Sequence, residues 1–242
     1  KIGIVDILKA KTTWAQIPLQ GGYFPRIYWT SDPSKLAIVR LDRKQRILDL
    51  FMTDIKTGTS DAVMKEDSKG WMDVYNFFAG ILHHFLFPTG VKEFYWISDR
   101  YGYQHLYRYD YNGKLLSQIT QGNWDVMTVE SLDPVADLLY YTSTEASGLE
   151  RHLYSIRLNG ADKRKITEEA GLHQIQFAPG GKYFIDTWSN LNTPRQTEIR
   201  SVDGTLIKSW QTNENVKTFI KTHVYAPKML DHISTTSGLN LD

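Results

Sequence analysis

The sequence predicts an all-β fold: a partial β-propeller of about four four-stranded antiparallel blades plus part of a fifth. Its 14 Tyr, 10 Phe and 7 Trp fall in short alternating runs that are typical of strands. No stretch combines a helical hydrophobic period with helix caps. The strand pattern also recurs, since 47 residues separate the His-Leu-Tyr motifs that begin at His105 and His152. Four short strands in a unit of roughly 45 residues are expected of a propeller blade.

The second, third and fourth strands of each blade are the clearest parts of the repeat. Buried second strands, each preceded by a turn, are expected at 35–40, 93–98, 137–142 and 182–187. Third strands are expected at 104–109 and 151–156, and each ends in an Asn-Gly turn, Asn112-Gly113 or Asn159-Gly160. Asn-Gly between two strands indicates a hairpin, so more polar fourth strands are expected at 114–120 and 163–167.

The first strands complete the blades. They are expected at 26–29, 71–75, 124–129 and 173–177, which gives blades of about 25–66, 70–120, 124–168 and 173–212. Residues 1–20 supply the last two strands of a preceding blade. An antiparallel sandwich or an open meander also has short strands at even spacing, but the regular self-similarity favours the propeller.

Four and a half blades do not readily close a ring, because each blade buries its faces against two neighbours. We therefore expect an arc with exposed ends, or part of a larger ring that has been cut from its context. Exposed blade faces would favour self-association, so a homo-oligomer is a possible state. The chain begins at Lys1 inside an apolar alternating segment, which favours a piece of a longer protein.

Composition excludes several classes of protein. The net charge is +1 without a Lys/Arg cluster, which argues against a nucleic-acid partner. The most apolar stretch, 77–87, is interrupted by Gly80, His83 and His84, so no membrane-spanning segment is expected. The absence of cysteine excludes disulfides, thiolate metal sites and cysteine nucleophiles.

Distinctive motifs occupy the predicted blades. They are Tyr23-Phe-Pro-Arg-Ile-Tyr-Trp29, Leu41-Asp-Arg-Lys-Gln45, Ser98-Asp-Arg-Tyr-Gly-Tyr-Gln-His-Leu-Tyr107, Gly122-Asn-Trp124, Thr142-Ser-Thr-Glu145 and Leu149-Glu-Arg-His-Leu-Tyr154, with the stretch 182–194. Together these motifs resemble the propeller of the dipeptidyl peptidase IV branch of the prolyl oligopeptidase family. Residues 231–242 resemble the first strand and turn of that family's α/β-hydrolase domain, although Ser237-Gly238 lacks the usual Asp. Residues 213–242 are therefore expected to be a linker and the start of a missing hydrolase domain.

The resemblance implies the propeller segment of a serine exopeptidase that removes amino-terminal dipeptides, typically Xaa-Pro or Xaa-Ala. In the whole protein this segment would help to form the cavity for the peptide substrate, and the family suggests a periplasmic or exported location. The alternative is a freestanding TolB-type or WD-type propeller that binds a protein or a ligand. The tail 231–242 favours the peptidase, because a freestanding module does not need it.

We expect no catalytic residue, metal site or cofactor within the chain. The nucleophile of such peptidases lies in a Gly-x-Ser-x-Gly motif, and the nearest sequence, Gly58-Thr59-Ser60, continues with Asp61-Ala62. His83 and His84 are adjacent, so on a strand they point to opposite faces and form a poor metal site. The chain alone is therefore expected to be inactive.

The substrate-proximal candidates are Tyr75 and Asn76. Gly70-Trp71 matches a Gly-Trp pair that precedes a substrate-facing propeller loop in the family, which would place both residues near the second residue of the substrate. Many members carry an aromatic residue and an Arg there, so Asn76 departs from the pattern. The alternative is that Tyr75 only packs in an inner strand.

The remaining charged and histidine motifs are expected to support the fold and not to bind the substrate. Glu168-Glu169 follows a strand and is expected in a solvated turn, so it is not assigned to bind the substrate's amino group. His105 and His152 occupy equivalent blade positions, which favours hydrogen bonds within each blade. Asp99-Arg100 and Glu150-Arg151 are expected to form loop ion pairs, which contribute little to stability when exposed.

Overall fold

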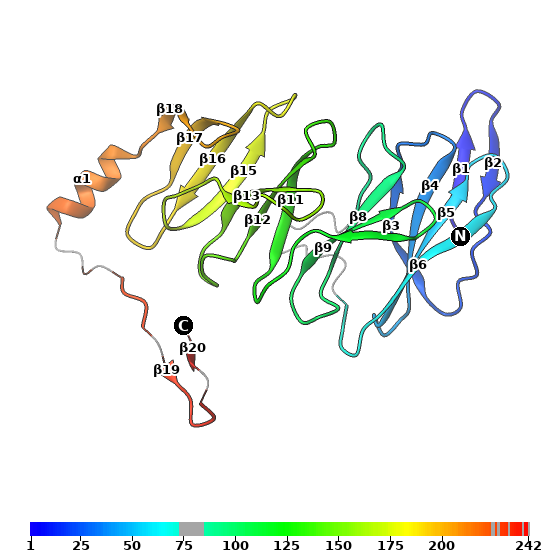
Figure 1. The fold of residues 1–242 in the computed structure, drawn as a ribbon, viewed down its shortest axis with the longest axis horizontal. Coiled ribbons are helices and arrows are strands. Elements are labelled where there is room, and N and C mark those ends of the chain that lie inside the picture. Colours follow the sequence, from blue (N-terminus) through cyan, green and yellow to red (C-terminus); the bar gives the residue numbers. More distant parts are fainter. Residues whose placement is uncertain (73–84, 224–225, 227, 232, 239, 242) are drawn as a thin grey trace. The chain divides into compact units, whose positions relative to one another are not determined.

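The computed structural model describes residues 1–72, 85–223, 226, 228–231, 233–238 and 240–241 (Figure 1). These residues form four four-stranded sheets, two two-stranded sheets and one helix. Within each four-stranded sheet the neighbouring strands are consecutive in the sequence. This arrangement confirms the predicted all-β fold of about four antiparallel four-stranded blades plus part of a fifth.

The amino-terminal half contains a two-stranded sheet and two four-stranded sheets. The two-stranded sheet pairs β1 (Gly3–Asp6) with β2 (Lys11–Trp14). The next sheet consists of β3 (Tyr23–Trp29), β4 (Lys35–Leu41), β5 (Ile47–Asp54) and β6 (Ser60–Asp67). The third consists of β7 (Phe85–Leu86), β8 (Glu93–Ser98), β9 (His105–Asp110) and β10 (Leu115–Gln118).

The strand expected at 71–75 differs from the structure. Trp71 and Met72 are not in a strand, and the remaining three residues lie outside the described residues. The strand that pairs with β8 on this side is β7, in which Phe85 lies opposite Trp96.

The carboxyl-terminal half contains two more four-stranded sheets. One consists of β11 (Val126–Asp133), β12 (Leu138–Ser143), β13 (His152–Arg157) and β14 (Arg164–Lys165). The other consists of β15 (Leu172–Phe177), β16 (Tyr183–Ser189), β17 (Gln196–Ser201) and β18 (Leu206–Gln211). The chain ends with the two-stranded pair β19 (Ile233–Ser234) and β20 (Asn240–Leu241).

Helix α1 (Glu214–Thr222) follows β18 and was not predicted from the sequence. Its apolar residues Val216, Phe219 and Ile220 recur at helical spacing, but the helix has only nine residues and Asn213 makes no side-chain capping bond. Glu214 in the first turn and Lys221 in the last turn complement the helix dipole. Lys217 also contacts Glu214 at 2.8 Å.

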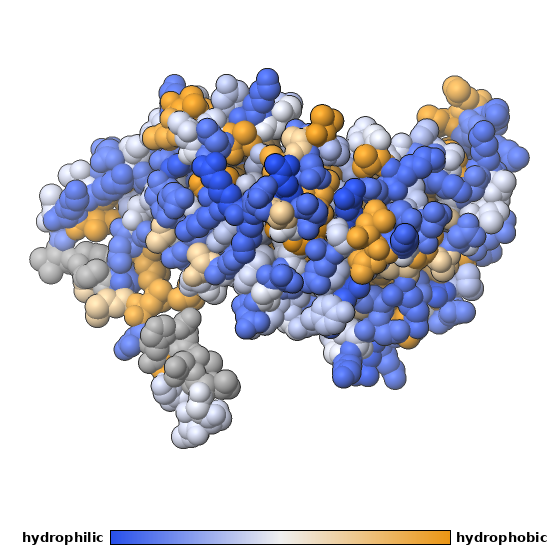
Figure 2. All heavy atoms as spheres, viewed as in Figure 1, coloured by the Kyte–Doolittle hydropathy of each residue, from blue (hydrophilic) through white to orange (hydrophobic). Residues whose placement is uncertain are grey.

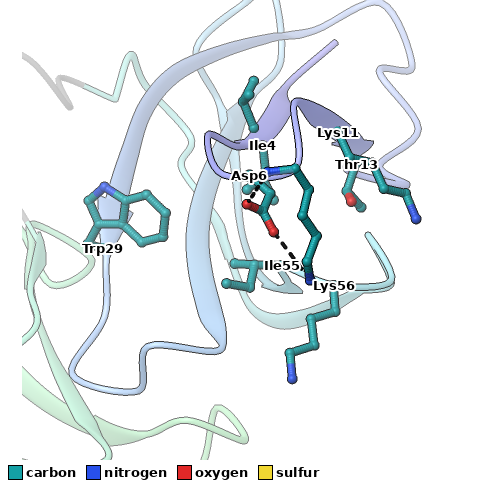
Figure 3. Close-up of a pocket in the computed structure, with 9 residues that line it drawn as sticks. Ile4, Asp6, Lys11, Thr13, Trp29, Ile55 and Lys56 are labelled. Atoms are coloured by element: carbon teal, nitrogen blue, oxygen red, sulfur yellow. Dashed lines mark hydrogen bonds and ion pairs between the residues drawn. The ribbon is translucent and has the colours of Figure 1, made fainter.

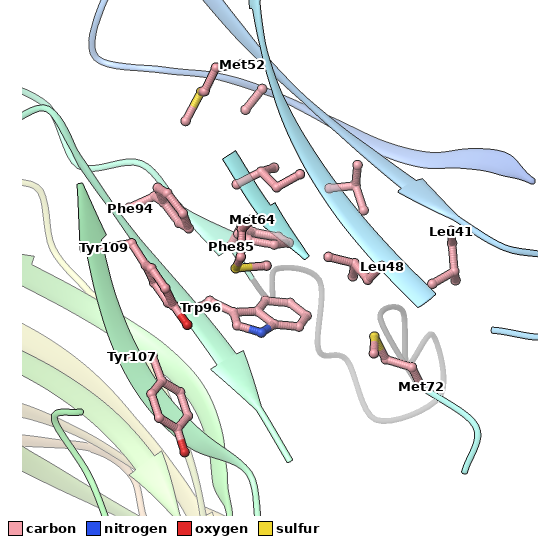
Figure 4. Close-up of a cluster of buried hydrophobic side chains, with 13 residues drawn as sticks. Leu41, Leu48, Met52, Met64, Met72, Phe85, Phe94, Trp96, Tyr107 and Tyr109 are labelled. Atoms are coloured by element: carbon pink, nitrogen blue, oxygen red, sulfur yellow. The ribbon is translucent and has the colours of Figure 1, made fainter. Parts of the chain in front are cut away.

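The chain divides into two compact units, 1–141 with 155–163, and 142–154 with 164–242. The core of the first unit lies between the β3–β6 and β7–β10 sheets (Figure 4). Aliphatic side chains such as Val39 and Leu50 come from one sheet, and aromatic side chains such as Phe94 and Trp96 come from the other. Phe94 stacks on Tyr109 with ring centroids 5.1 Å apart.

The β3–β6 sheet is covered on both faces, which explains the continuous apolar sequence of β4. Leu36 and Ile38 on β4, with Phe51 on β5, form a second cluster. Ile2 and Ile4 from the amino-terminal segment pack against this cluster. A strand that is buried on both faces has no reason to alternate apolar with polar residues.

Three of the four hairpins between third and fourth strands share one turn. In the β9–β10 hairpin, Gly113 N donates to Asp110 O at 3.0 Å and Asp110 N donates to Lys114 O at 3.1 Å. The hairpins 157–161 and 201–205 repeat this pair of bonds. The turn places its fourth residue at positive φ, between 81° and 93° in these three hairpins, so glycine is required there.

Each of these glycines also touches the preceding sheet. Gly58 of the β5–β6 hairpin makes the same kind of contact as the other three glycines. Each of the four faces a backbone carbonyl of the preceding sheet. That carbonyl lies in the last strand of the sheet or directly after it. The pairs are Gly58 with Trp14, Gly113 with Val63, Gly160 with Ile119, and Gly204 with Ile166. A methyl group on Gly113 would overlap the Val63 oxygen, so the contact requires glycine for its size as well as for its conformation.

Replacing Gly113 should show this contact in stability. Gly113→Ala adds both backbone strain at a φ of 81° and overlap with Val63, and we expect a loss of about 3 kcal/mol in the free energy of unfolding. Gly90 is the matched control, because its φ is 85° and nothing lies near an added methyl group. Gly90→Ala should lose only about 1 to 2 kcal/mol. Equal losses in urea unfolding would contradict the contact.

Candidate functional site

The predicted residues Tyr75 and Asn76 lie outside the described residues, as do His83 and His84. The chain on both sides of this segment is described. The candidate site is therefore built from the residues that hold the segment's two ends, Met72 and Phe85.

Gln45 holds the amino-terminal end. Its backbone carbonyl accepts a hydrogen bond from Met72 N at 2.7 Å. Its side-chain oxygen accepts a hydrogen bond from Trp71 Nε1, and its Nε2 donates to the Tyr23 hydroxyl at 2.7 Å. One residue thus ties Trp71 and Met72 to the β4–β5 hairpin and to β3.

The hairpin that presents Gln45 is itself rigidly bonded. Asp42 Oδ1 accepts the backbone N–H groups of Arg46 and Ile47 at 2.6 and 2.8 Å. These bonds lower the pKa of Asp42, because they stabilise its charged form. Gln45 has a φ of 53°, a left-handed conformation that the turn imposes on it.

The carboxyl-terminal end of the segment enters the same core. Phe85 is buried and stacks on Trp96, with ring centroids 4.3 Å apart. Met72 is buried in the same cluster, so both ends are fixed against one set of side chains (Figure 4).

A buried carboxylate lies beside this core. Glu66 on β6 accepts three hydrogen bonds from the β7–β10 sheet and the loop after β8: from Trp96 Nε1 at 2.7 Å, Ser98 Oγ at 2.6 Å and Arg100 Nη2 at 2.5 Å. The Arg100 guanidinium also lies 4.2 Å from the Tyr107 ring centroid. Burial raises the pKa of Tyr107 to about 12, so its hydroxyl stays neutral at physiological pH.

This cluster corrects one sequence interpretation. Arg100 was expected to pair with Asp99 in a loop, but it bonds Glu66, 34 positions earlier in the chain. Glu66 itself was missed, although a signal existed. Met64 and Glu66 are two residues apart on β6 and share its buried face.

His105 and His152 make the hydrogen bonds within their blades that their equivalent positions predicted. Nδ1 of each ring lies against a threonine hydroxyl fifteen residues later, Thr120 at 3.2 Å and Thr167 at 3.0 Å. Each hydroxyl also accepts the backbone N–H of the residue after the histidine. The repeat of histidine, threonine and backbone is architectural.

Glu150, His152 and Thr167 resemble a catalytic triad in connectivity. His152 Nε2 lies 2.7 Å from Glu150 Oε2, so Glu150 bonds His152, while Arg151 donates to the carbonyl oxygens of Gly148 and Glu150. Burial lowers the pKa of His152, although the Glu150 carboxylate acts in the opposite direction. Thr167 has no exposed surface, so its hydroxyl cannot reach a substrate.

Glu168-Glu169 lies at the surface after a strand, as expected, and the partly exposed Glu169 also has an ion-pair partner. Glu168 is exposed, but Glu169 accepts a bond from Arg200 Nη2 at 2.8 Å. Arg200 bonds Glu198 at 2.6 Å and lies 3.8 Å from Asp186. Burial alone would lower the pKa of Arg200, but its bonds to Glu198 and Glu169 raise it overall.

His173 completes this polar cluster. Its Nδ1 lies 2.9 Å from both Asp186 oxygens and its Nε2 lies 2.7 Å from the Glu169 carbonyl. Each ring nitrogen therefore lies beside a hydrogen-bond acceptor of the same blade. The side chains of His173 and Asp186 are fully buried, which makes this pair structural.

A pocket of about 500 Å³ lies between the β1–β2 hairpin and one end of the β3–β6 sheet (Figure 3). Ile4, Ile55 and the exposed Trp29 supply its apolar surface, and lysines supply positive charge at its rim. Lys9 lies 3.7 Å from Asp6, which also accepts the Lys9 backbone N–H. On the face in Figure 2, hydrophobic residues form separate patches among hydrophilic ones.

The described part of the chain contains no group of three side chains arranged to hold a metal ion. Within the same residues, no helix has the length and apolar character needed to cross a membrane.

The sequence of residues 1–195 matches a family model described as the dipeptidyl peptidase IV (DPP IV) N-terminal region. The chain belongs to this family. The resemblance drawn from the blade motifs is therefore confirmed. A dipeptidyl peptidase 4 of Arthroderma otae is 28% identical over 157 residues, which are 62% of this chain and 20% of the relative. A dipeptidyl peptidase 4 of Trichophyton equinum is 24% identical over 211 residues, which are 85% of this chain and 26% of the relative.

The fold of this DPP IV N-terminal region also has solved counterparts. The crystal structure of Porphyromonas gingivalis dipeptidyl peptidase 4 matches with a TM-score of 0.89 and 26% identity, over 98% of this chain and 33% of that one. The chain spans about a quarter of the length of the curated relatives that it matches.

Removing the buried carboxylate should destabilise the first unit. Glu66→Ala leaves Arg100 and two other donors without their shared acceptor, and we expect a loss of about 3 kcal/mol in the free energy of unfolding. Asp67→Ala is the control on the same strand, because Asp67 pairs with Lys65 in an exposed ion pair. That change should cost less than about 1 kcal/mol. Similar losses in both variants would contradict the role of Glu66.

Proposed function

We propose that this chain is the propeller segment of a serine exopeptidase that removes dipeptides from the amino terminus of peptides, usually after Pro or Ala. The match of residues 1–195 to the DPP IV N-terminal region carries the proposal. The likeness to a dipeptidyl peptidase 4 over 98% of the chain supports it. The chain has no Gly-x-Ser-x-Gly motif, so the proposal assigns the nucleophile to an α/β-hydrolase domain outside these 242 residues.

In this proposal the whole 242-residue chain is non-catalytic and forms part of the wall of the substrate cavity. Residues 73–84 carry Tyr75 and Asn76 to the second residue of the substrate. The buried positions of Met72 and Phe85 support this role, because they anchor the chain on both sides of residues 73–84, and anchoring reduces the entropy cost of binding a substrate. Tyr75 packs against the substrate side chain, and Asn76 offers a neutral hydrogen bond.

The test uses the longer protein that contains this chain, with Gly-Pro and Ala-Pro chromogenic amides as substrates. Tyr75→Ala should raise KM about tenfold with little change in kcat, which corresponds to about 1.4 kcal/mol of lost binding. Asn76→Ala should have a smaller effect, because a neutral hydrogen bond contributes a net free energy of only about 1 kcal/mol. Tyr101→Ala is the control, since Tyr101 is an exposed tyrosine on the loop after β8.

Two results would contradict the proposal. If the reading frame that continues after residue 242 lacked a hydrolase with Gly-x-Ser-x-Gly, or if the longer protein bound peptides without cleaving them, a freestanding binding propeller would be favoured. If Tyr75→Ala and Tyr101→Ala left KM equally unchanged, Tyr75 would not contact the substrate. The 242 residues alone should not cleave either amide.

A further inference from the structure

The four hairpins that dock against a preceding sheet differ in the residue before their glycine. These residues are Thr57, Asn112, Asn159 and Asp203. The two asparagines form the only Asn-Gly sequences in the chain. Asparagine before glycine is prone to spontaneous loss of its amide, because glycine has no side chain to shield its backbone nitrogen.

We propose that Asn112-Gly113 is a site of spontaneous deamidation, and that Asn159-Gly160 is protected although its backbone is equivalent. In this reaction Gly113 N bonds to Asn112 Cγ, the Cγ–Nδ2 bond breaks, and ammonia leaves with the proton from the backbone amide. Water then opens the cyclic imide at either carbonyl. The products are aspartate or isoaspartate, in which the main chain runs through the former side chain.

The side chains of the two turns are bonded differently. Asn159 Oδ1 accepts the Ala161 backbone N–H at 2.9 Å, which holds its side chain in place. In the other turn, the equivalent N–H of Lys114 is accepted by Asp110 Oδ1, also at 2.9 Å. The exposed Asn112 side chain is therefore left without a hydrogen bond among the described residues.

The difference arises from one residue at the start of each turn. Asp110 supplies the acceptor in the first turn, whereas the second turn has Arg157 at the same position. Arg157 has no acceptor to offer, so Asn159 takes the bond instead. Asp203 in the fourth hairpin does the same, accepting Thr205 N at 3.0 Å.

The modification would act on the contact between two sheets. Isoaspartate at 112 inserts a methylene into the main chain directly before Gly113, which faces the Val63 carbonyl at close range. Aspartate at 112 adds the same negative charge without lengthening the chain. The isoaspartate product should therefore loosen the contact more than the aspartate product.

The test is to incubate the purified chain at mildly alkaline pH and to follow the peptides that contain Asn112 and Asn159 by mass spectrometry. Asn112 should deamidate about fivefold faster than Asn159, the factor that one ordinary hydrogen bond contributes. Arg157→Asp gives the second turn the acceptor of the first, and it should raise the rate at Asn159 to that of Asn112. Equal rates in the wild-type chain, or no rise with Arg157→Asp, would overturn the proposal.

The stability of the product provides a second readout. The isoaspartate form, separated by ion exchange, should melt below both the unmodified chain and the Asn112→Asp variant. If the isoaspartate form and Asn112→Asp melted at the same temperature, the proposed effect on the sheet contact would be wrong. Neither measurement depends on peptidase activity, so failure here is distinct from failure of the proposed function.

Discussion

One backbone contact between neighbouring sheets recurs at four places in this chain. In each, a hairpin glycine faces a carbonyl in or directly after the last strand of the preceding sheet. The contact needs a residue that tolerates positive φ and that has no side chain. Glycine alone meets both conditions. Because the contacting group is a turn, the length and type of the hairpin determine how closely one sheet approaches the next. Side-chain packing such as the Phe94–Tyr109 stack then fills the space that this spacing leaves.

The contact between the β3–β6 and β7–β10 sheets also creates the buried polar site at Glu66. Its carboxylate comes from one sheet, and its donors come from the next sheet and the loop after β8, so the bonds form only when the two sheets are in contact. Met72 and Phe85 enter the core beside it, which links the packing of these sheets to the ends of the segment that carries Tyr75 and Asn76. The sheet contact therefore fixes the positions of Met72 and Phe85, the described residues on either side of Tyr75 and Asn76.

Local sequence patterns were sufficient to predict most of the strands, the Asn-Gly hairpins and the paired histidines, because each depends on residues within one blade. The strand expected at 71–75 was wrong, since β7 takes that place beside β8. The recurrence of His-Leu-Tyr even predicted the bonding of His105 and His152. The partners of Arg100 and Glu169 were not predictable in this way. Arg100 bonds a residue 34 positions away and Glu169 bonds one 31 positions away, across strands whose spatial order a single sequence does not contain. The role of Gln45 was missed for the same reason, since it joins β3 to Trp71.

Native-state hydrogen exchange of single amides tests the glycine contact most directly. Gly113 N–H and Gly238 N–H each donate at 3.0 Å within a turn, and the two glycines have φ of 81° and 82°. They differ in surroundings, because Gly113 faces the Val63 carbonyl while nothing lies near Gly238. The account predicts that Gly113 N–H exchanges slowly, in step with the amides of β6 and β9, while Gly238 N–H exchanges rapidly. Equally rapid exchange at both glycines would contradict it.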